Sequence, residues 1–149
     1  MAVLYTLEIY TPRRMFFSDS VEALTLVIAD GEIGVYANHS RFTAPVKCSV
    51  AKIKDKKGVW KIAFIGDGII EVKRHKTVLL TVAAEWPEEI DYERVLRSKK
   101  DAEEMLKSSH FQFERLAAKE KIRRADVRLK TCVAANIIPD SRTLNTSAS

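Results

Sequence analysis

The sequence has little cysteine, glycine or proline, with 2, 5 and 4 of them among 149 residues. Cys48 and Cys132 lie far apart and belong to no CxxC pair, which excludes a disulfide framework and gives no sign of zinc or redox chemistry. The content of 46% hydrophobic residues excludes collagen-like, low-complexity and wholly disordered chains. No apolar run approaches the ~20 residues of a membrane span, and the N-terminus has no signal-peptide pattern. These absences predict a protein of a reducing, aqueous compartment.

The first half of the sequence has a hydrophobic pattern that repeats every two residues, from residue 2 to about residue 85. Tyr5, Leu7 and Ile9, for example, alternate with polar or half-polar neighbours, as in a half-buried strand. Two polar connections, at 55–58 and 74–76, separate apolar runs in the manner of β-hairpin turns. The pattern predicts an antiparallel β-sandwich of about ten strands. This predicted domain covers residues 1–87.

The hydrophobic pattern becomes helical after Pro87, which cannot continue a central strand. Asp91 is a good N-cap for a helix, and apolar residues then recur at a spacing of three to four. Ser109, with Gln112 three residues later, fits a capping box that opens a second helix. The sequence therefore predicts an antiparallel two-helix hairpin over residues 88–133.

The second predicted helix has a narrow apolar stripe. Its members are Phe111, Ala118, Ile122, Ala125, Leu129 and Val133. Burying so little apolar surface is worth a few kcal/mol, at ~0.8 kcal/mol per methylene. The hairpin could therefore detach and dock again while its helices persist, as a two-state switch requires; a permanently docked hairpin is the alternative. Residues 134–149 are predicted to form a disordered tail.

Positive charge is concentrated in the second half of the chain. The whole sequence has a formal net charge of +5, and residues 90–149 supply +4 of it from 13 basic and 9 acidic side chains. Most of this charge lies on the second predicted helix, which leaves three interpretations open. The helix presents a solvated surface, a nucleic-acid-binding face whose cations neutralise phosphates, or a face for an acidic protein partner. The residues interleaved with the cations are Ala, Ile and Leu rather than stacking aromatics, which argues against nucleic acid.

No residue pattern indicates catalysis or a metal site. The three histidines do not stand at metal-ligand spacing from another ligand. His39 and Ser40 are adjacent and lack a third partner, so they do not form a convincing pair of base and nucleophile. The Gly-Asp-Gly sequence at 66–68 is too short to hold a phosphate and is predicted to be a tight turn between strands. We therefore expect the chain not to be an enzyme and to hold no metal.

The order of these features resembles the epsilon subunit of the F-type ATP synthase, from about residue 4 to residue 133. The segments that carry the resemblance are Leu7-Glu8-Ile9-Tyr10-Thr11-Pro12, Phe17-Ser18, Val21-Glu22, Asp30-Gly31-Glu32-Ile33-Gly34-Val35, Asn38-His39, Gly68-Ile69-Ile70-Glu71-Val72, Ala83-Ala84-Glu85 and Ile90-Asp91. No single segment is decisive, but their order and spacing together are specific to this family.

The resemblance implies a non-catalytic subunit of the rotor. In this family the β-sandwich binds the gamma subunit and the ring of c subunits, so that rotation of the ring is coupled to gamma. The C-terminal helices can swing up into the alpha/beta hexamer, where they restrain ATP hydrolysis. Such subunits occur once per complex at the cytoplasmic face of the bacterial plasma membrane, or at the thylakoid when plastid-encoded, and bind no nucleic acid. The alternative from another class is a free-standing basic adaptor that binds nucleic acid through its second helix.

The resemblance also implies two protein-binding sites. The residues that correspond to the contact with the c ring are Gly31, Glu32, Ile33, Gly34, Asn38, His39 and Arg41. The basic residues of the inhibitory second helix, which would meet the acidic C-terminal region of beta, are Arg115, Lys119, Arg123, Arg124 and Arg128. Residues 38–41 read Asn-His-Ser-Arg where the family commonly has Gly-His-Ala-Pro, so this loop departs from the family pattern.

Some bacterial members of the family bind ATP on the folded hairpin through an Ile-Asp-x-x-Arg-Ala motif. The chain matches this motif at 90–94 but has Val95 in place of the last alanine. The residues that the resemblance implies for regulatory ATP are Glu85, Ile90, Asp91, Arg94, Arg124 and Arg128. Arginines one turn apart can grip phosphates, while carboxylates accept hydrogen bonds from the adenine amine or the ribose. The alternative is purely structural, with Asp91 as the N-cap and Arg94 on the surface. No other cofactor is expected.

Overall fold

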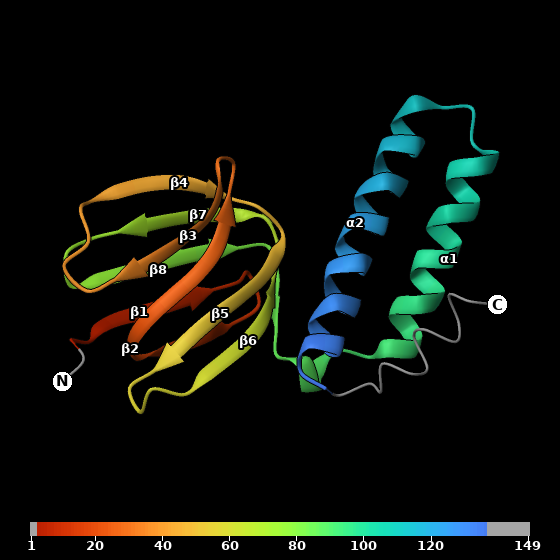
Figure 1. Ribbon diagram of the computed structural model, residues 1–149. Helices are drawn as coiled ribbons and strands as arrows, with labels where there is room; N and C mark the ends of the chain where they lie inside the picture. Colours follow the sequence, from red (N-terminus) through yellow and green to blue (C-terminus); the bar gives the residue numbers. More distant parts are fainter. Residues whose placement is uncertain (1–2, 137–149) are drawn as a thin grey trace. The chain divides into compact units, whose positions relative to one another are not determined.

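The computed structural model describes residues 3–136 and divides the chain into two compact units, Met1–Trp86 and Pro87–Ser149. The first unit is built from strands and the second from helices (Figure 1). This confirms the predicted fold class, with nine strands in the described residues where about ten were expected. From residue 137 on, the predicted tail lies outside the described residues.

The strands of the first unit follow the two-residue hydrophobic period closely. They are β1 (Tyr5–Tyr10), β2 (Met15–Ile28), β3 (Gly31–Tyr36), β4 (Phe42–Val46), β5 (Ser49–Asp55), β6 (Trp60–Ile65), β7 (Gly68–Val72), β8 (Lys76–Thr81) and β9 (Ala84–Glu85). In β1 every second residue is buried, because successive side chains of a strand point to opposite faces of the sheet. The tight turn predicted at 66–68 connects β6 to β7 and is thereby confirmed.

Strand β2 links the two layers of the sandwich. One layer runs in the order β1-β8-β7-β4, and the other contains β3, β2, β5, β6 and β9. The first part of β2 pairs with β1, and its second part pairs with β3 and β5. All pairs are antiparallel except β1 with β8. This 14-residue strand pairs with β1 at its start and with β4 through Ile28 at its end, so it joins the two layers at both edges of the β1-β8-β7-β4 layer (Figure 1).

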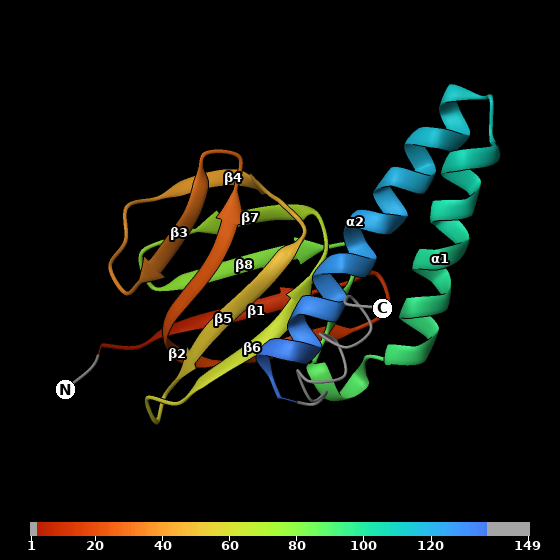
Figure 2. The same cartoon turned by 45° about the vertical axis from the view of Figure 1, so that its right-hand side comes forward.

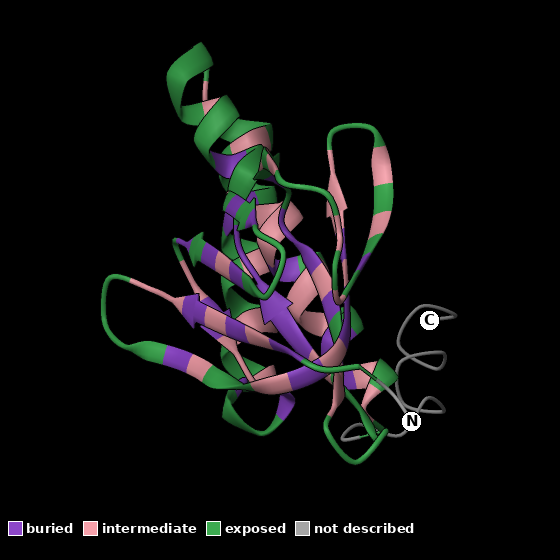
Figure 3. Ribbon diagram, turned by 90° about the vertical axis from the view of Figure 1, so that its left-hand side faces the viewer, coloured by how far each residue is buried: buried purple, intermediate pink, exposed green. Residues whose placement is uncertain are grey.

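The core of the sandwich lies between these layers and is made almost entirely of aliphatic side chains. Buried and exposed positions alternate along the strands (Figure 3). Fully burying one such side chain contributes about 1.5–3 kcal/mol. Tyr5 is also buried, and its hydroxyl donates a hydrogen bond of 2.8 Å to the carbonyl of Val35. Burial, with a smaller contribution from Tyr36, raises the pKa of Tyr5 above its ordinary value of 10.0.

Thr77, in the middle of this core, provides a test of the packing. Its hydroxyl is fully buried and has no hydrogen-bond partner among the residues that the structure describes. An unsatisfied buried hydroxyl costs about 1–3 kcal/mol. We expect Thr77→Val to raise the free energy of unfolding by about 1 kcal/mol in urea titrations. The matched control is Thr81→Val, because the Thr81 hydroxyl lies 2.9 Å from the carbonyl of Gly66. This substitution should lower the free energy of unfolding. If both variants change the free energy of unfolding in the same direction, the Thr77 hydroxyl is not the unsatisfied group described here.

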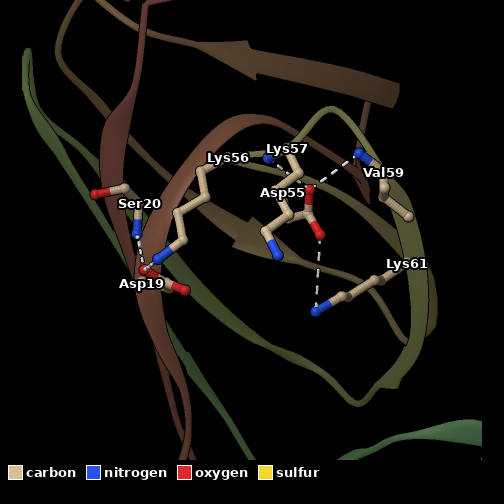
Figure 4. Close-up of polar contacts among 7 residues, drawn as sticks. All are labelled: Asp19, Ser20, Asp55, Lys56, Lys57, Val59 and Lys61. Atoms are coloured by element: carbon tan, nitrogen blue, oxygen red, sulfur yellow. Dashed lines mark hydrogen bonds and ion pairs between the residues drawn. The ribbon is translucent and has the colours of Figure 1, made fainter.

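The turn between β5 and β6 is held by the carboxylate of Asp55 (Figure 4). The backbone N–H groups of Lys57 and Val59 donate to this carboxylate at 2.8 and 2.9 Å, and the ammonium of Lys61 lies 3.9 Å away. The hydrogen bond from Val59 is the largest reason why the pKa of Asp55 lies below its ordinary value. The hydrogen bonds explain why residues 55–58 form the hairpin connection that their polarity predicts.

A second carboxylate on the neighbouring strand interacts with the same turn. Asp19 in β2 accepts a hydrogen bond of 2.8 Å from the backbone of Ser20, and the ammonium of Lys56 lies 3.5 Å away (Figure 4). The bond from Ser20 is the main cause of the lowered pKa of Asp19. Because both side chains are exposed, the ion pair between Asp19 and Lys56 adds little to the stability of the turn.

The second unit is a short 3-10 helix, η1 (Pro87–Glu89), followed by two antiparallel helices, α1 (Tyr92–Ser108) and α2 (Gln112–Ala134) (Figure 2). Asp91 caps α1 as predicted, because its carboxylate accepts the N–H of Arg94 at 3.2 Å. No helix in the described part of the chain combines the length and the hydrophobicity that a membrane crossing requires.

The predicted capping box at the start of α2 is wrong. Ser109 instead ends α1, where its N–H donates to the carbonyl of Met105. Its hydroxyl accepts the N–H of Phe111 at 3.2 Å and lies 2.6 Å from the carboxylate of Glu114. The connection between the helices is so short that one serine serves the end of α1 and the loop, which leaves Phe111 as an N-cap without a side-chain bond.

The seam between the two helices is lined by small residues. Ala102 of α1 and Ala118 and Ala125 of α2 are buried, and the interhelical ion pair between Lys99 and Asp126 measures 2.7 Å. The predicted stripe is correct for the central positions but wrong for Phe111, which is 71% exposed. Phe111 lies before the first helical residue, so the helical period does not apply to it.

Candidate functional site

The residues predicted to meet the c ring lie along β3, an edge strand that pairs only with β2 among the described strands. Residues 31–34 begin the strand, whereas Asn38, His39 and Arg41 follow its far end. A six-residue strand is about 20 Å long, so the structure does not gather the predicted set at one point. Two residues here have a positive φ, which explains why glycine and asparagine occupy these positions. Gly31 has φ +121°, and Asn38 has a left-handed φ of 63°.

The loop after β3 has its own local order. The ring of His39 donates a hydrogen bond of 2.9 Å from Nδ1 to the carbonyl of Ser40 and lies 5.2 Å from the ring of Phe42. Asn38 donates its backbone N–H to the carbonyl of Arg74 in the β7–β8 turn. The hydrogen bond from His39 to the carbonyl of Ser40 therefore helps to shape this loop.

A hollow of about 390 Å³ opens on the outer face of the other layer, beside the turn at 66–68. It is lined by Tyr10, Thr11, Pro12, Asp67, Gly68, Ile69, Leu80, Thr81 and Val82. Ile69, Leu80 and Val82 are 53%, 55% and 64% exposed, and they line the same hollow, so they form a group of exposed aliphatic side chains. We call Tyr10, Pro12, Ile69, Leu80 and Val82 the outer apolar patch.

A polar network beneath the patch keeps the turn rigid. Asp67 accepts the backbone N–H of Cys48 at 2.8 Å, which ties the start of β5 to the turn. The hydroxyl of Thr81 lies within 2.9–3.1 Å of the carbonyls of Gly66, Asp67 and Ala83. These contacts connect the turn to β5 and to the end of β8.

Sequence reasoning missed the outer apolar patch, although a signal for it exists. At Ile69-Ile70 and Leu79-Leu80 the apolar residues follow one another instead of alternating. Because Ile70 and Leu79 fill the core, their apolar neighbours must point outward. A break in the alternation inside a strand is thus the sequence signature of this surface.

The residues predicted for regulatory ATP are divided between the two units. Glu85 belongs to β9 of the sandwich, while Ile90, Asp91, Arg94, Arg124 and Arg128 belong to the hairpin. Ile90 is largely buried, and the carboxylate of Asp91 is occupied as the N-cap of α1. Arg124 and Arg128 lie one helical turn apart on α2 and are half-buried.

The predicted basic face of α2 is not uniform. The guanidinium of Arg115 donates to the carbonyl of Leu106, so it closes the end of α1. Arg123 forms an ion pair of 2.8 Å with Glu120 on the same helix. Lys119 is exposed. Arg115 and Arg123 thus have structural partners inside the hairpin.

The described residues contain no group of three or more His, Cys, Asp or Glu side chains placed to hold a metal ion. Cys48 and Cys132 are both buried.

Two family matches together cover almost all of the described chain. Residues 4–87 match the β-sandwich domain of the ATP synthase delta/epsilon chain, and residues 88–132 match its long α-helix domain. Both matches agree with the two halves read from hydrophobic periodicity.

Curated relatives and solved structures agree with the family matches. The chain is 40% identical over 127 residues to an ATP synthase epsilon chain of Caldanaerobacter subterraneus, covering 85% of this chain and 91% of the relative. It is 45% identical over 102 residues to that of Caldicellulosiruptor bescii, covering 68% and 74%.

A chain in the mitochondrial ATP synthase of Euglena gracilis shares the fold, with a TM-score of 0.76 at 18% identity over 93% of this chain and 84% of that one. A chain in the central stalk and c ring of the Tetrahymena thermophila enzyme has a TM-score of 0.60 at 12% identity, covering 88% and 98%. The family resemblance seen in the sequence is confirmed. The chain therefore belongs to the delta/epsilon chain family of ATP synthase, among the epsilon subunits of the F-type enzyme.

Proposed function

We propose that the chain is a non-catalytic subunit of the central stalk, present once per complex, that couples rotation of the c ring to the gamma subunit. Family membership supports this role, as do the structural neighbours, whose complexes include F1, the central stalk and the c ring. As such a subunit, the chain would lie at the cytoplasmic face of the bacterial plasma membrane as a peripheral component.

The observation that carries this proposal is the outer apolar patch. A surface that leaves three large aliphatic side chains more than half exposed around a hollow suits a permanent protein partner. We assign the patch to the gamma subunit, because a subunit that couples the c ring to gamma must stay bound to gamma throughout rotation. The c ring is assigned to β3 and its flanking loops, where Glu32 and Arg41 are exposed charges.

The second part of the proposal is a conformational brake. The helices of the hairpin have 17 and 23 residues, longer than the ~12–15 below which isolated helices are marginal in water. The alanine-lined seam offers little apolar surface, so the hairpin can change its packing at a modest cost. In its extended state α2 would meet the acidic C-terminal region of beta and restrain ATP hydrolysis.

Adenine nucleotide is the proposed ligand of the folded hairpin, held by Arg124 and Arg128 at the phosphates. To turn such a switch from 1:99 to 99:1, the ligand must favour one state by about 5.5 kcal/mol.

The brake is tested by removing two charges from α2. We expect the double variant Arg124→Gln/Arg128→Gln to inhibit ATP hydrolysis about tenfold less effectively in the reconstituted complex. Two half-exposed ion pairs of about 0.7 kcal/mol each sum to about 1.4 kcal/mol, which corresponds to a factor of ten. The matched control is Lys107→Gln/Lys130→Gln, which removes the same charge from exposed positions of the hairpin. Equal inhibition by both double variants would contradict electrostatic docking.

Co-purification separates this function from the nucleic-acid alternative. A stalk subunit must co-purify with gamma and c subunits from detergent extracts, whereas a basic adaptor must be retained on DNA or RNA and released by salt. Membership in the epsilon-chain family favours co-purification with gamma and c subunits.

A further inference from the structure

The β5–β6 hairpin carries a concentration of lysines beside two exposed apolar side chains. Val59 and Trp60, where β6 begins, are 54% and 49% exposed. The lysines of the hairpin are Lys52, Lys54, Lys56, Lys57 and Lys61. We call these lysines, together with Val59 and Trp60, the lysine–tryptophan tip. The turn at 73–76 is also basic but contains no apolar residue, so the tip is distinguished by the combination of charge and apolar surface.

Strand pairing places the tryptophan beside lysines on the outer face of the layer. Lys54 pairs with Trp60 in the β5–β6 ladder, so the two side chains project to the same side. Ile53 is fully buried in the core, so its neighbours Lys52 and Lys54 point away from the core. The ammonium of Lys54 lies 5.9 Å from the centre of the Trp60 ring. The ring and the cations therefore belong to one surface.

The acidic side chains near the tip do not cancel its positive charge. Glu22 lies 3.8 Å from the ammonium of Lys54, but the Glu22 side chain is only 16% exposed. The Asp55 side chain is 17% exposed, and its carboxylate accepts two backbone N–H groups of the turn. Asp19 is about as exposed as its partner Lys56. Five lysines against these three carboxylates leave a net charge of +2, with most of the exposed charge positive (Figure 4).

An anionic lipid surface fits this combination better than nucleic acid does. Lysines lay their methylene stems along apolar surface and keep the ammonium group among the phosphates, while tryptophan prefers the boundary between water and hydrocarbon. Apolar contact and attraction to anionic headgroups then add to the same binding. Nucleic acid binds cations and stacks on aromatic rings, but it makes no use of the exposed aliphatic side chain of Val59.

The position of the tip in the sandwich agrees with a lipid surface. Ala23 of β2 pairs with Tyr36 at the end of β3 on one side and with Lys54 near the end of β5 on the other. The loop after β3 and the β5–β6 turn therefore leave this layer at the same end. The proposed function assigns the loop after β3 to the c ring and the chain to a membrane face, so this end of the layer is the one that approaches lipid.

We propose that the lysine–tryptophan tip is a docking site for the headgroups of anionic lipids. Its lysines lie on the lipid phosphates, and Val59 and Trp60 enter the interface between headgroups and acyl chains. The proposal rests on the proposed function only in bringing this end of the sandwich to a membrane. It gives the chain a direct contact with lipid that does not depend on any other subunit.

The first test measures binding of the full chain to lipid vesicles. We expect the chain to sediment with vesicles of phosphatidylglycerol and not with vesicles of phosphatidylcholine. The emission of Trp60 should shift to shorter wavelength and be quenched by phosphatidylglycerol brominated on its acyl chains. Trp60→Phe keeps an aromatic ring at the tip and leaves Trp86 as the fluorophore, so this variant should still sediment but show no quenching.

The second test removes two cations from the tip. Lys52 and Lys57 form no ion pair within residues 3–136, so Lys52→Gln/Lys57→Gln breaks no interaction of the fold. We expect this double variant to bind phosphatidylglycerol vesicles weaker by about tenfold or more. Lys107→Gln/Lys130→Gln has the same net charge, with both substitutions at exposed positions of the helices, and should weaken binding by less than threefold. Circular dichroism checks that both variants are folded.

Four results would overturn the proposal. They are equal binding to both kinds of vesicle, sedimentation without quenching of Trp60, quenching of Trp86 in the Trp60→Phe variant, and equal weakening by the two double variants. Tighter binding to single-stranded DNA than to phosphatidylglycerol vesicles, lost in Lys52→Gln/Lys57→Gln, would assign the tip to nucleic acid instead.

Vesicle binding and co-purification fail independently. A chain that ignores vesicles but co-purifies with gamma and c subunits overturns the lipid site and leaves the coupling role intact. A chain that binds phosphatidylglycerol vesicles through the tip but never co-purifies with those subunits overturns the coupling role alone.

Discussion

Gly68→Ala should lower the free energy of unfolding by about 3 kcal/mol or more, the upper end of the cost of overpacking. A Cβ at this position would lie 2.1 Å from the carbonyl oxygen of Leu80 and 2.9 Å from Cα of Thr81. Both atoms belong to the backbone of β8, which pairs with Gly68, so neither can move without breaking the β7–β8 ladder. Urea unfolding followed by tryptophan fluorescence measures the loss, which is a large share of the ~5–15 kcal/mol that stabilises a domain.

Gly34→Ala is the matched control for this prediction. A Cβ at position 34 would meet the ring of Tyr36 at 3.1 Å, and that side chain is 60% exposed and can rotate away. We expect a cost below about 1 kcal/mol. If both variants lose a similar amount of unfolding free energy, the cause is the replacement of a conformationally flexible glycine in general. The close approach of β8 to Gly68 would then not explain the loss.

The fold of this chain could be predicted from its sequence to the level of elements. The two-residue period of β1 and the three-to-four spacing of α1 reflect local geometry, and both were predicted correctly. The extent of β2 was not predictable, because its first half carries Ser18, Asp19 and Ser20, which look like a turn. These residues are strand only because β1 pairs with them, and pairing between distant segments has no local signal.

The candidate sites were less predictable than the fold. The residue types of Gly31 and Asn38 suggest positions with positive φ, as the structure has them. The sequence did not show that β3 lies between them and keeps them apart. Arg115 looks like part of a continuous basic face, and only the folded hairpin shows that it closes α1. The outer apolar patch depends on which of two adjacent apolar residues fills the core, which the packing of the two layers decides.

A chain that ends at Trp86 should stay folded as a β-sandwich and lose all inhibition of ATP hydrolysis. The core cluster consists of residues between Tyr5 and Trp86, so removing residues 87–149 takes away none of its members. Trp86 itself must be kept, because its ring stacks on that of Phe16 with 4.5 Å between centroids and meets Phe17 edge-on. Such aromatic pairs add about 0.5–1.5 kcal/mol beyond their burial.

The shortened chain distinguishes the coupling role from the brake. Because the outer apolar patch and β3 are complete in it, it should assemble with gamma and the c ring and support ATP synthesis driven by an ion gradient, while hydrolysis rises to that of the uninhibited complex. Its counterpart is a full-length chain with Leu80→Asp, which places a charge in the patch and should prevent assembly although the hairpin is intact. If the shortened chain unfolds in urea titrations, the two halves are not independent. If it folds and the complex remains inhibited, the restraint on hydrolysis lies in the sandwich and not in the helices.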